Sequence, residues 1–214
     1  MTTRVVVLGA GGFATEVADV FRDLALTGHF YLLGFVDRDR ARQGEWVNDT
    51  RILGTLEDLP DDDAKVIAGA GEIVPRKRQV EEAEASGRGF VSVVHPTVVK
   101  SPFVTIGTGC VICAGSILTN DIILGNHVAL NLGVTVGHNC RIGDHCVLSP
   151  GVHVSGWVSL EREVYVGTGA VILPRVSVGA GAVIGAGAVV TKDVAAGETV
   201  VGMPARRVHH EDVP

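Results

Sequence analysis

Residues 106–142 read IGTGCVICAGSILTNDIILGNHVALNLGVTVGHNCRI, and a period of six residues runs through them. Every sixth residue, starting at Ile106, is aliphatic as far as Val190. The residue two places earlier in each repeat, from Val104 onward, is small or aliphatic, and glycine often follows the aliphatic residue. Two inward positions and recurrent glycines in a six-residue repeat are typical of a parallel β-helix, in which three repeats close one triangular coil. We therefore predict about five coils over residues 104–191.

The register of this repeat does not slip, so residues that are 18 apart are predicted to stack in one column, about 4.8 Å per coil. Aromatic residues make up only 5% of the chain, and beyond residue 100 they are Phe103, Trp157 and Tyr165. A narrow triangular interior explains this composition, because aromatic rings do not fit inside it.

Four cysteines fall within the repeat. Cys110, Cys140 and Cys146 occupy the small inward position, where cysteine packs as a compact apolar residue. Cys110 and Cys146 are two coils apart, roughly 9–10 Å, which is too far for a disulfide. Cys113 is predicted to project outward. We therefore expect the inward cysteines to pack structurally, rather than to form a disulfide or a metal cluster.

Residues 1–95 have a different pattern, in which short apolar runs alternate with amphipathic segments. The predicted elements, in chain order, are strand 4–8, helix 13–24, strand 31–36, strand 64–68 and helix 74–86. Strands that alternate with helices in this way indicate βαβ units around a parallel sheet. We place a domain boundary near residue 95.

A glycine-rich turn, Gly9-Ala-Gly-Gly12, joins the first predicted strand to the first helix. The backbone N–H groups of Gly11 and Gly12 would suit a phosphate, and Asp37, at the end of the second strand, would suit a ribose hydroxyl. The third glycine of G-x-G-x-x-G is missing, since Thr15 stands near its place. We favour nucleotide or nucleotide-sugar binding, with NAD binding and a purely structural turn as the alternatives.

Charge and hydropathy exclude several classes of partner. The net charge is −6, from 18 basic and 24 acidic residues, and there is no run of Lys or Arg, which disfavours a nucleic-acid surface. The N-terminal apolar run is too short for a signal peptide, and no apolar stretch reaches 18 residues. We expect a cytoplasmic protein with no nucleic-acid and no membrane partner.

Histidines at outward or corner positions are the candidates for acid–base chemistry. His138 has Gly156 one coil beyond it, and Asp121 lies close to the position one coil before it. An imidazole beside a backbone without a side chain leaves space for a ligand and an N–H group for a developing oxyanion. His127 and His145 are 18 residues apart and are predicted to stack. Spacing alone does not choose among these histidines.

Seven motifs along the chain resemble those of a known enzyme family: Val5–Gly12, Gly34–Asp37, Asn131–Cys140, Ile142–Asp144, Ser149–Gly151, Ser155–Gly156 and Val200–Ala205. With them the chain resembles the bacterial sugar acyltransferases of the left-handed β-helix superfamily, in the group of sialic acid O-acetyltransferases and NDP-amino-sugar N-acetyltransferases. The resemblance implies an α/β Rossmann-like half-domain over residues 1–95 that binds a nucleotide sugar. It also implies an all-β left-handed parallel β-helix of about five coils over residues 96–214, with the acyltransferase site and a C-terminal CoA-binding segment.

The resemblance also implies roles for single residues. His138 matches the general base that removes a proton from the acceptor as it attacks the acetyl-CoA thioester. Asn131 matches a residue of the acceptor pocket, and Gly156 matches a glycine whose N–H meets the thioester carbonyl. Many family members have an acid just before the base, where this chain has Gly137. We therefore expect Asp121 to orient His138 instead.

The closing segment of the chain resembles the family's CoA channel. Gly202, Pro204 and Ala205 match its backbone lining, and Arg206, with Arg207 after it, is placed to meet CoA phosphates. Acetyl-CoA is thus the expected cosubstrate. No metal is expected, because an imidazole can take a proton at neutral pH and a thioester needs no metal.

Three departures from the family bear on the acceptor. Family members commonly have His where Phe13 stands, Lys or Arg where Thr15 stands, and some have a second histidine where Val147 stands. N-acetylation of an NDP-linked amino sugar is the favoured activity. O-acetylation of a sugar would suit the changed positions better, while a non-catalytic hexapeptide scaffold and an NAD-dependent dehydrogenase are the other hypotheses.

A homotrimer is the expected assembly. Related transferases place the acyl-CoA site between neighbouring β-helices, and outward apolar residues such as Leu132 and Trp157 need a partner to cover them.

Overall fold

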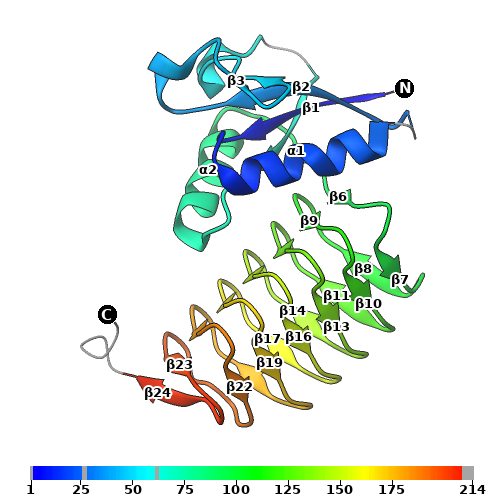
Figure 1. Cartoon of the computed structure of the whole chain (residues 1–214), viewed down its shortest axis with the longest axis vertical. Coiled ribbons are helices and arrows are strands. Elements are labelled where there is room, and N and C mark those ends of the chain that lie inside the picture. The colour runs from blue at the N-terminus through cyan, green and yellow to red at the C-terminus, as the bar shows by residue number, and fades with distance from the viewer. Residues whose placement is uncertain (1, 26–27, 61–62, 209–214) are drawn as a thin grey trace. The chain divides into compact units, whose positions relative to one another are not determined.

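The computed structural model describes residues 2–25, 28–60 and 63–208, which form two compact units (Figure 1). The first unit consists of Met1–Pro96 with Thr108–Cys110, and the second of Thr97–Gly107 with Val111–Pro214. Within the described ranges, neither helix is long and apolar enough to cross a membrane.

The first unit is built on a three-stranded parallel sheet in the order β2-β1-β5. Its strands are β1 (Thr3–Leu8), β2 (Phe30–Val36) and β5 (Lys65–Ala68), and its helices are α1 (Gly12–Leu24) and α2 (Ile73–Ala85). Between β2 and β5 lie two short 3-10 turns, η2 (Arg40–Arg42) and η3 (Leu56–Asp58), and the hairpin of β3 (Trp46–Val47) and β4 (Thr50–Arg51). β6 (Val93–Val94) comes last. The predicted βαβ pattern is confirmed.

The central strand β1 explains why this unit folds as it does. Val5, Val6 and Val7 are fully buried, as a parallel strand covered on both faces requires. Helix α1 buries a stripe that includes Val17 and Phe21, while Leu8, Val66 and Ala83 belong to one apolar core cluster. Because the three strands are parallel, they all end at one edge of the sheet, where the turns that follow them meet.

The second unit is a parallel β-solenoid whose strands form three sheets (Figure 1). The first sheet contains β7 (Val99–Lys100), β10 (Ile117–Leu118), β13 (Thr135–Val136), β16 (His153–Val154), β19 (Val171–Ile172) and β22 (Val189–Val190). The second contains β8 (Val104–Ile106), β11 (Ile122–Leu124), β14 (Arg141–Ile142), β17 (Ser159–Leu160) and β20 (Ser177–Val178). The third includes β9 (Val111–Ile112), β12 (Ala129–Leu130), β15 (Val147–Leu148), β18 (Tyr165–Val166), β21 (Val183–Ile184), β23 (Thr199–Val201) and the antiparallel β24 (Arg206–Val208).

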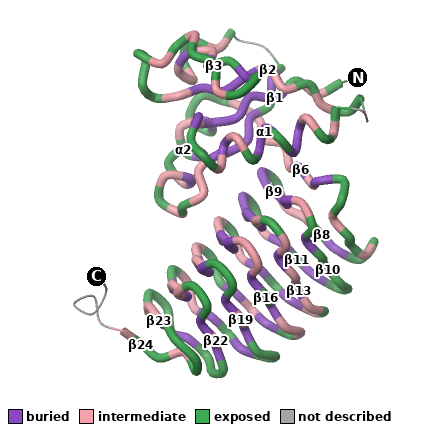
Figure 2. The backbone as a smooth tube through the Cα atoms, in the orientation of Figure 1, coloured by how far each residue is buried: buried purple, intermediate pink, exposed green. Residues whose placement is uncertain are grey.

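Paired residues in neighbouring turns are 18 apart, as Thr135 and His153 are, so the predicted columns are confirmed. The small position of every repeat from Val104 to Ala188 is buried (Figure 2). The aliphatic position is buried from Ile112 to Val190, and Ile106 is half-buried. The interior is thus made of side chains from two positions per repeat.

The solenoid has six turns rather than the five that we predicted, because the first sheet has six strands. At the start, Lys100 stands in the aliphatic position, so the hydrophobic rule misses β7. At the end, Ile184 pairs with Val200, only 16 residues later. The corner after β22 is therefore two residues shorter, and a step of six from Val190 falls on Ala196 instead of a core residue.

The corners of the solenoid contain residues with positive φ. One corner column is all glycine, and another consists of Asp121, Asn139, Trp157 and Arg175, with φ between 53° and 66°. Left-handed backbone is tolerated best by Gly, Asn and Asp, because other side chains clash with the backbone there. This constraint places the side chains of Asp121 and Asn139 one above the other.

The four cysteines, which all lie in the described part of the chain, are buried and none is in a disulfide. Cys110, Cys140 and Cys146 are fully buried, so their predicted inward packing is confirmed. The outward placement of Cys113 was wrong, since it is 1% exposed. It stands in the corner column that also contains Ser149, which is buried too.

Candidate functional site

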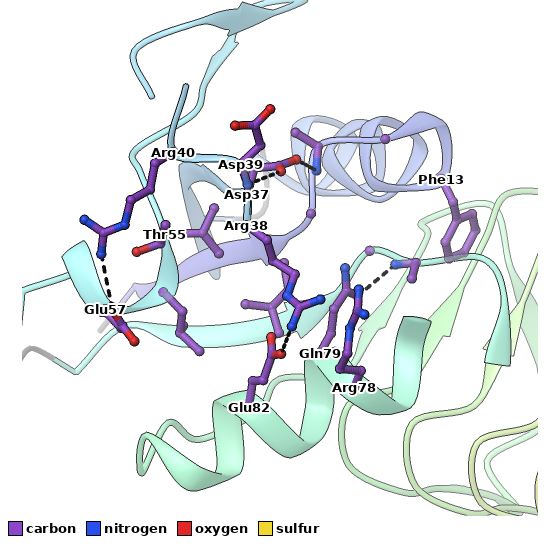
Figure 3. Close-up of a pocket in the computed structure, with 18 of the residues that line it drawn as sticks. Phe13, Asp37, Arg38, Asp39, Arg40, Thr55, Glu57, Arg78, Gln79 and Glu82 are labelled. Carbon is purple, nitrogen blue, oxygen red and sulfur yellow. Dashed lines mark hydrogen bonds and ion pairs between the residues drawn. The ribbon is translucent and has the colours of Figure 1, made fainter. Parts of the chain in front are cut away.

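The first unit contains a cavity of about 1050 Å³ at the carboxyl ends of β1, β2 and β5 (Figure 3). It is lined by three turns that follow these strands and by helix α2; the turns are 9–12, 37–40 and 69–71. In open parallel sheets, this edge is where ligands bind, because the strand ends and helix N-termini converge there.

The glycine-rich turn presents bare backbone to this cavity. A Cβ atom on Gly11 or Gly12 would meet nothing within 4 Å. Gly11 caps helix α1 without a side-chain hydrogen bond, and the first turn of the helix has no acidic residue. Such an uncapped N-terminus attracts negative charge.

Asp37 lines the cavity, but its carboxylate already has several donors. It accepts hydrogen bonds from the N–H of Ala10 (3.2 Å) and of Asp39 (3.0 Å), and from the Arg42 guanidinium (3.0 Å). A carboxylate accepts about four hydrogen bonds, so room for one more donor is left. Asp37 therefore ties the glycine-rich turn to the end of β2, besides facing the cavity.

Three arginines that sequence reasoning missed also line the cavity. Arg38 pairs with Glu82 on α2 (2.6 Å) and Arg40 pairs with Glu57 (3.1 Å), while Arg78 is exposed and has no acidic partner among the described residues (Figure 3). For Arg78, the signal in the sequence was the basic stretch at the start of the helix 74–86.

In the second unit, His138 follows β13 and Gly156 follows β16, one turn later. A Cβ atom on Gly156 would lie 2.8 Å from both Nε2 and Cε1 of His138, so the imidazole rests on the glycine backbone. The Trp157 ring meets the imidazole edge-on, with ring centroids 6.3 Å apart, and Arg175 lies over the Trp157 ring. The column predicted from the 18-residue spacing is thus present.

Asn139 stands between His138 and Asp121. The Nδ1 of His138 is 2.9 Å from Oδ1 of Asn139, and Nδ2 of Asn139 donates to the Asp121 carboxylate. Asp121 therefore reaches His138 through the Asn139 amide and not by a direct contact. Because an amide oxygen only accepts, this contact selects the neutral tautomer that has its proton on Nδ1 and its lone pair on Nε2. The sequence signal for these contacts was the spacing of Asp121 and Asn139, because residues 18 apart stack in neighbouring turns.

The N–H group of Gly156 has no hydrogen-bond acceptor among the described residues. At three comparable corner positions a side-chain oxygen takes this N–H: Asp144 accepts from Asn126, Asn131 from Leu132, and Glu161 from Ala180. The corner beside His138 thus combines a lone pair on an imidazole with an unengaged backbone donor.

His127 and His145 stack as predicted, with ring centroids 5.1 Å apart and an angle of 14° between the rings. His127 is buried and His145 is half-buried. No group of three or more potential metal-ligating side chains gathers anywhere in residues 2–25, 28–60 or 63–208.

Both halves of the chain match known families. Residues 4–83 match the PglD N-terminal domain, and residues 158–192 match the bacterial transferase hexapeptide (six repeats). The chain is 34% identical over 212 residues to GDP-perosamine N-acetyltransferase of Escherichia coli O157:H7, covering 94% of this chain and 95% of that protein. This chain belongs to the hexapeptide-repeat sugar acetyltransferases. It is an acyltransferase, as the sequence motifs predicted.

Solved structures of the family agree over nearly the whole chain. The acetyltransferase domain of PglB from Neisseria gonorrhoeae, in complex with acetyl coenzyme A, is 32% identical with a TM-score of 0.87, covering 97% of this chain and 100% of that one. A point mutant of perosamine N-acetyltransferase from Caulobacter crescentus, in complex with CoA and GDP-perosamine, is 29% identical with a TM-score of 0.89 and 98% coverage of both chains.

Within the second unit of this acetyltransferase, two of the predicted parts of the site, Asn131 and the 202–205 segment, lie away from the His138 corner. Asn131 directly follows β12, whereas His138 follows β13, so they lie at successive corners of the solenoid. The 202–205 segment is held beside Val189, the first residue of β22, by backbone bonds from Val189 to Gly202 (3.0 Å) and from Ala205 to Val189 (2.8 Å).

The two basic residues of the closing segment are engaged within the chain. The Arg206 guanidinium donates to the carbonyl of Ala205, and Arg207 forms an ion pair with Glu198 (3.2 Å). Pro204, between Gly202 and Ala205, follows a cis peptide bond and is exposed. Both side chains are exposed, but among the described residues only Arg207 is paired with a carboxylate, so Arg206 is the better placed of the two for an anion.

Proposed function

We propose that the protein transfers the acetyl group of acetyl-CoA to the amino group of an NDP-linked amino sugar, with His138 as general base. The observation that carries this proposal is the contact of the His138 imidazole with Gly156, which sets a proton acceptor beside a backbone donor. The amine nitrogen attacks the thioester carbonyl carbon and gives its proton to Nε2 of His138. The Gly156 N–H stabilises the oxyanion, and CoA leaves as the thiol after taking that proton.

Asn139 and Asp121 serve His138 as positioning residues in this mechanism. The Asp121 carboxylate holds the Nδ2 group of Asn139, so Oδ1 of the amide faces Nδ1 of His138. This arrangement favours the tautomer with a proton on Nδ1, which is the one that can accept a proton at Nε2. Asn139 and Asp121 thus take the role that family members give to an acidic residue just before the base.

The cavity of the first unit is the proposed site for the nucleotide diphosphate. The N–H groups of Gly11 and Gly12 and the Arg78 guanidinium supply donors and positive charge. They replace the polar groups that family members have at Phe13 and Thr15; here the Thr15 hydroxyl is engaged by the carbonyl of Gly12 (2.6 Å). Since two relatives are named for perosamine linked to GDP, a GDP-linked amino sugar is the first acceptor to test.

We propose a homotrimer in which neighbouring copies complete each site. The support is the separation of the predicted residues within one chain, because Asn131 and the 202–205 segment lie away from the His138 corner. Leu132 and Trp157 are 44% and 51% exposed and would be covered by a neighbour. Acetyl-CoA and nucleotide sugars are cytoplasmic metabolites, so we place the enzyme in the cytoplasm.

Acetyl transfer is tested by incubating the purified protein with acetyl-CoA and a panel of sugars, with thiol release and product mass as readouts. The panel pairs each GDP-linked and UDP-linked 4-amino sugar with the matching 4-hydroxy sugar. We expect an amide product from the amino sugars only. Transfer to the hydroxy sugars alone would establish O-acetylation, and no thiol release with either set would favour a binding scaffold.

A further inference from the structure

The Cys140 thiol lies directly behind the backbone on which His138 rests. Cys140 occupies the small inward position of its repeat and is fully buried. Its Sγ donates to the carbonyl oxygen of Ser155 at 3.0 Å and is 3.8 Å from the carbonyl oxygen of His138. One side chain thus touches the backbone of both partners in the proposed site.

The Ser155 carbonyl and the Gly156 N–H belong to the same peptide group. In a trans peptide these two groups point in opposite directions. Because Sγ of Cys140 holds the carbonyl toward the interior of the solenoid, the N–H of Gly156 faces outward. A side chain at Gly137 would have its Cβ atom 2.6 Å from the Gly156 nitrogen, so the glycine there keeps the outward N–H uncovered.

The same contact recurs at two corners that lack a histidine like His138. The Ser116 hydroxyl donates to the carbonyl of Asn131 (3.1 Å), and Sγ of Cys146 donates to the carbonyl of Glu161 (2.9 Å). The spacing from donor to acceptor is 15 residues in each case, as it is for Cys140 and Ser155. At three corners of this solenoid, an inward Ser or Cys thus donates to the corner carbonyl.

Burial raises the pKa of the Cys140 thiol, so it stays protonated and remains a donor. Among the described residues the Cys140 thiol is the donor to the Ser155 carbonyl, so its removal would leave this oxygen without that hydrogen bond, at a cost in free energy. The peptide would then turn to find a partner, and its N–H would turn with it.

We infer that Cys140 is a positioning residue for acetyl transfer, which aims the Gly156 N–H at the developing oxyanion by holding the other end of its peptide group. The inference rests on the proposed function, in which that N–H stabilises the oxyanion. In this role the buried thiol affects the rate of acetyl transfer only through its hydrogen bond, and the sulfur does not react.

Four variants test this inference: Cys140→Ala and Cys140→Ser, with Cys146→Ala and Cys146→Ser as matched controls. Alanine removes the donor, and serine keeps one. Loss of a whole oxyanion donor costs about 10²–10³ in kcat, so we expect a misaimed one in Cys140→Ala to cost roughly tenfold. The KM for the amino sugar should stay unchanged, and Cys140→Ser should restore most of kcat. Cys146→Ala should lower the melting temperature comparably but leave kcat within about twofold.

Equal kcat values for Cys140→Ala and Cys146→Ala, or a Cys140→Ser variant as slow as Cys140→Ala, would overturn the inference. Crystal structures of the two Cys140 variants give a readout that does not depend on activity. We expect the 155–156 peptide to be rotated in Cys140→Ala and native in Cys140→Ser; an unrotated peptide in both also overturns the inference. If the wild-type protein transfers no acetyl group, the proposed function fails, and the crystal structures still decide whether Cys140 orients the peptide.

Discussion

The imidazole of His138 lies directly on the α-carbon of Gly156, so closely that a methyl group there would stand 2.8 Å from Nε2. Gly156→Ala should therefore displace the ring without disturbing the solenoid, because Ala180 and Ala186 occupy the same place in their own repeats. We expect kcat to fall by roughly 10–10², since small misplacements of catalytic groups have effects of this size. Steady-state kinetics and a melting curve check this, and wild-type kcat with an unchanged melting temperature would refute the placement.

His138→Ala removes the proposed base itself. We expect kcat to fall by roughly 10²–10⁴, which is the usual contribution of general acid–base catalysis. The fold should survive because the side chain is exposed at a corner. His153→Ala is the matched control, because His153 is also exposed. Its ring hydrogen-bonds to the Thr135 hydroxyl (2.8 Å), whereas the His138 ring rests on the Gly156 backbone. A folded His138→Ala enzyme with the turnover of His153→Ala would move attention to His127 and His145.

Asn139→Gly tests the contact that orients the base. Glycine accepts the φ of 60° at this corner, so the substitution removes the amide without adding backbone strain. We expect kcat to fall roughly tenfold, in line with the loss of one hydrogen bond. Glu163→Gly, at another corner with a φ of 61°, is the control for backbone effects. The kcat values of both variants are measured under the same conditions, and equal values would show that Asn139 does not orient the base.

Mixed trimers test whether neighbouring copies share a site. His138→Ala and Asn131→Ala chains, with different tags, are co-expressed and the mixed species is purified. If each site of a cyclic trimer takes His138 from one copy and Asn131 from the next, every mixed trimer contains one intact site. We expect about one third of wild-type activity from the mixture, although each parent is inactive. An inactive mixture would show that both residues act within one chain, and a monomer in sedimentation would exclude the shared site.

Burial raises the pKa of the Cys146 thiol from 9.0 to about 12. In the unfolded chain this thiol ionises near pH 9, while in the folded chain it stays neutral until about pH 12. The contribution of this thiol to the free energy of unfolding should therefore be fully present below pH 9 and be lost as the pH rises from 9 to 12. Chemical unfolding at pH 8 and pH 10.5, at one protein concentration, measures the fall. It should be smaller in Cys146→Ala, and an identical fall would mean that this thiol does not contribute.

Local pattern alone determined the architecture of the second unit. A repeat of six residues admits one arrangement, because three short strands close a turn and bring residues 18 apart into contact. The contact of His138 with Gly156 and the stacking of His127 on His145 follow from that arithmetic. The same holds for the strand, glycine turn and helix at the start of the chain, whose apolar spacing and turn residues are local signals.

Contacts between segments far apart in the sequence were decided only by the tertiary structure. The pairing of Ile184 with Val200 depends on a corner shortened by two residues, which a fixed period cannot reveal. Arg78 reaches the cavity because helix α2 packs against the sheet beside the glycine-rich turn, about 65 residues away in the chain. The place of Asn139 between the base and Asp121 depends on side-chain rotamers at a corner, and such directions follow from packing rather than from spacing.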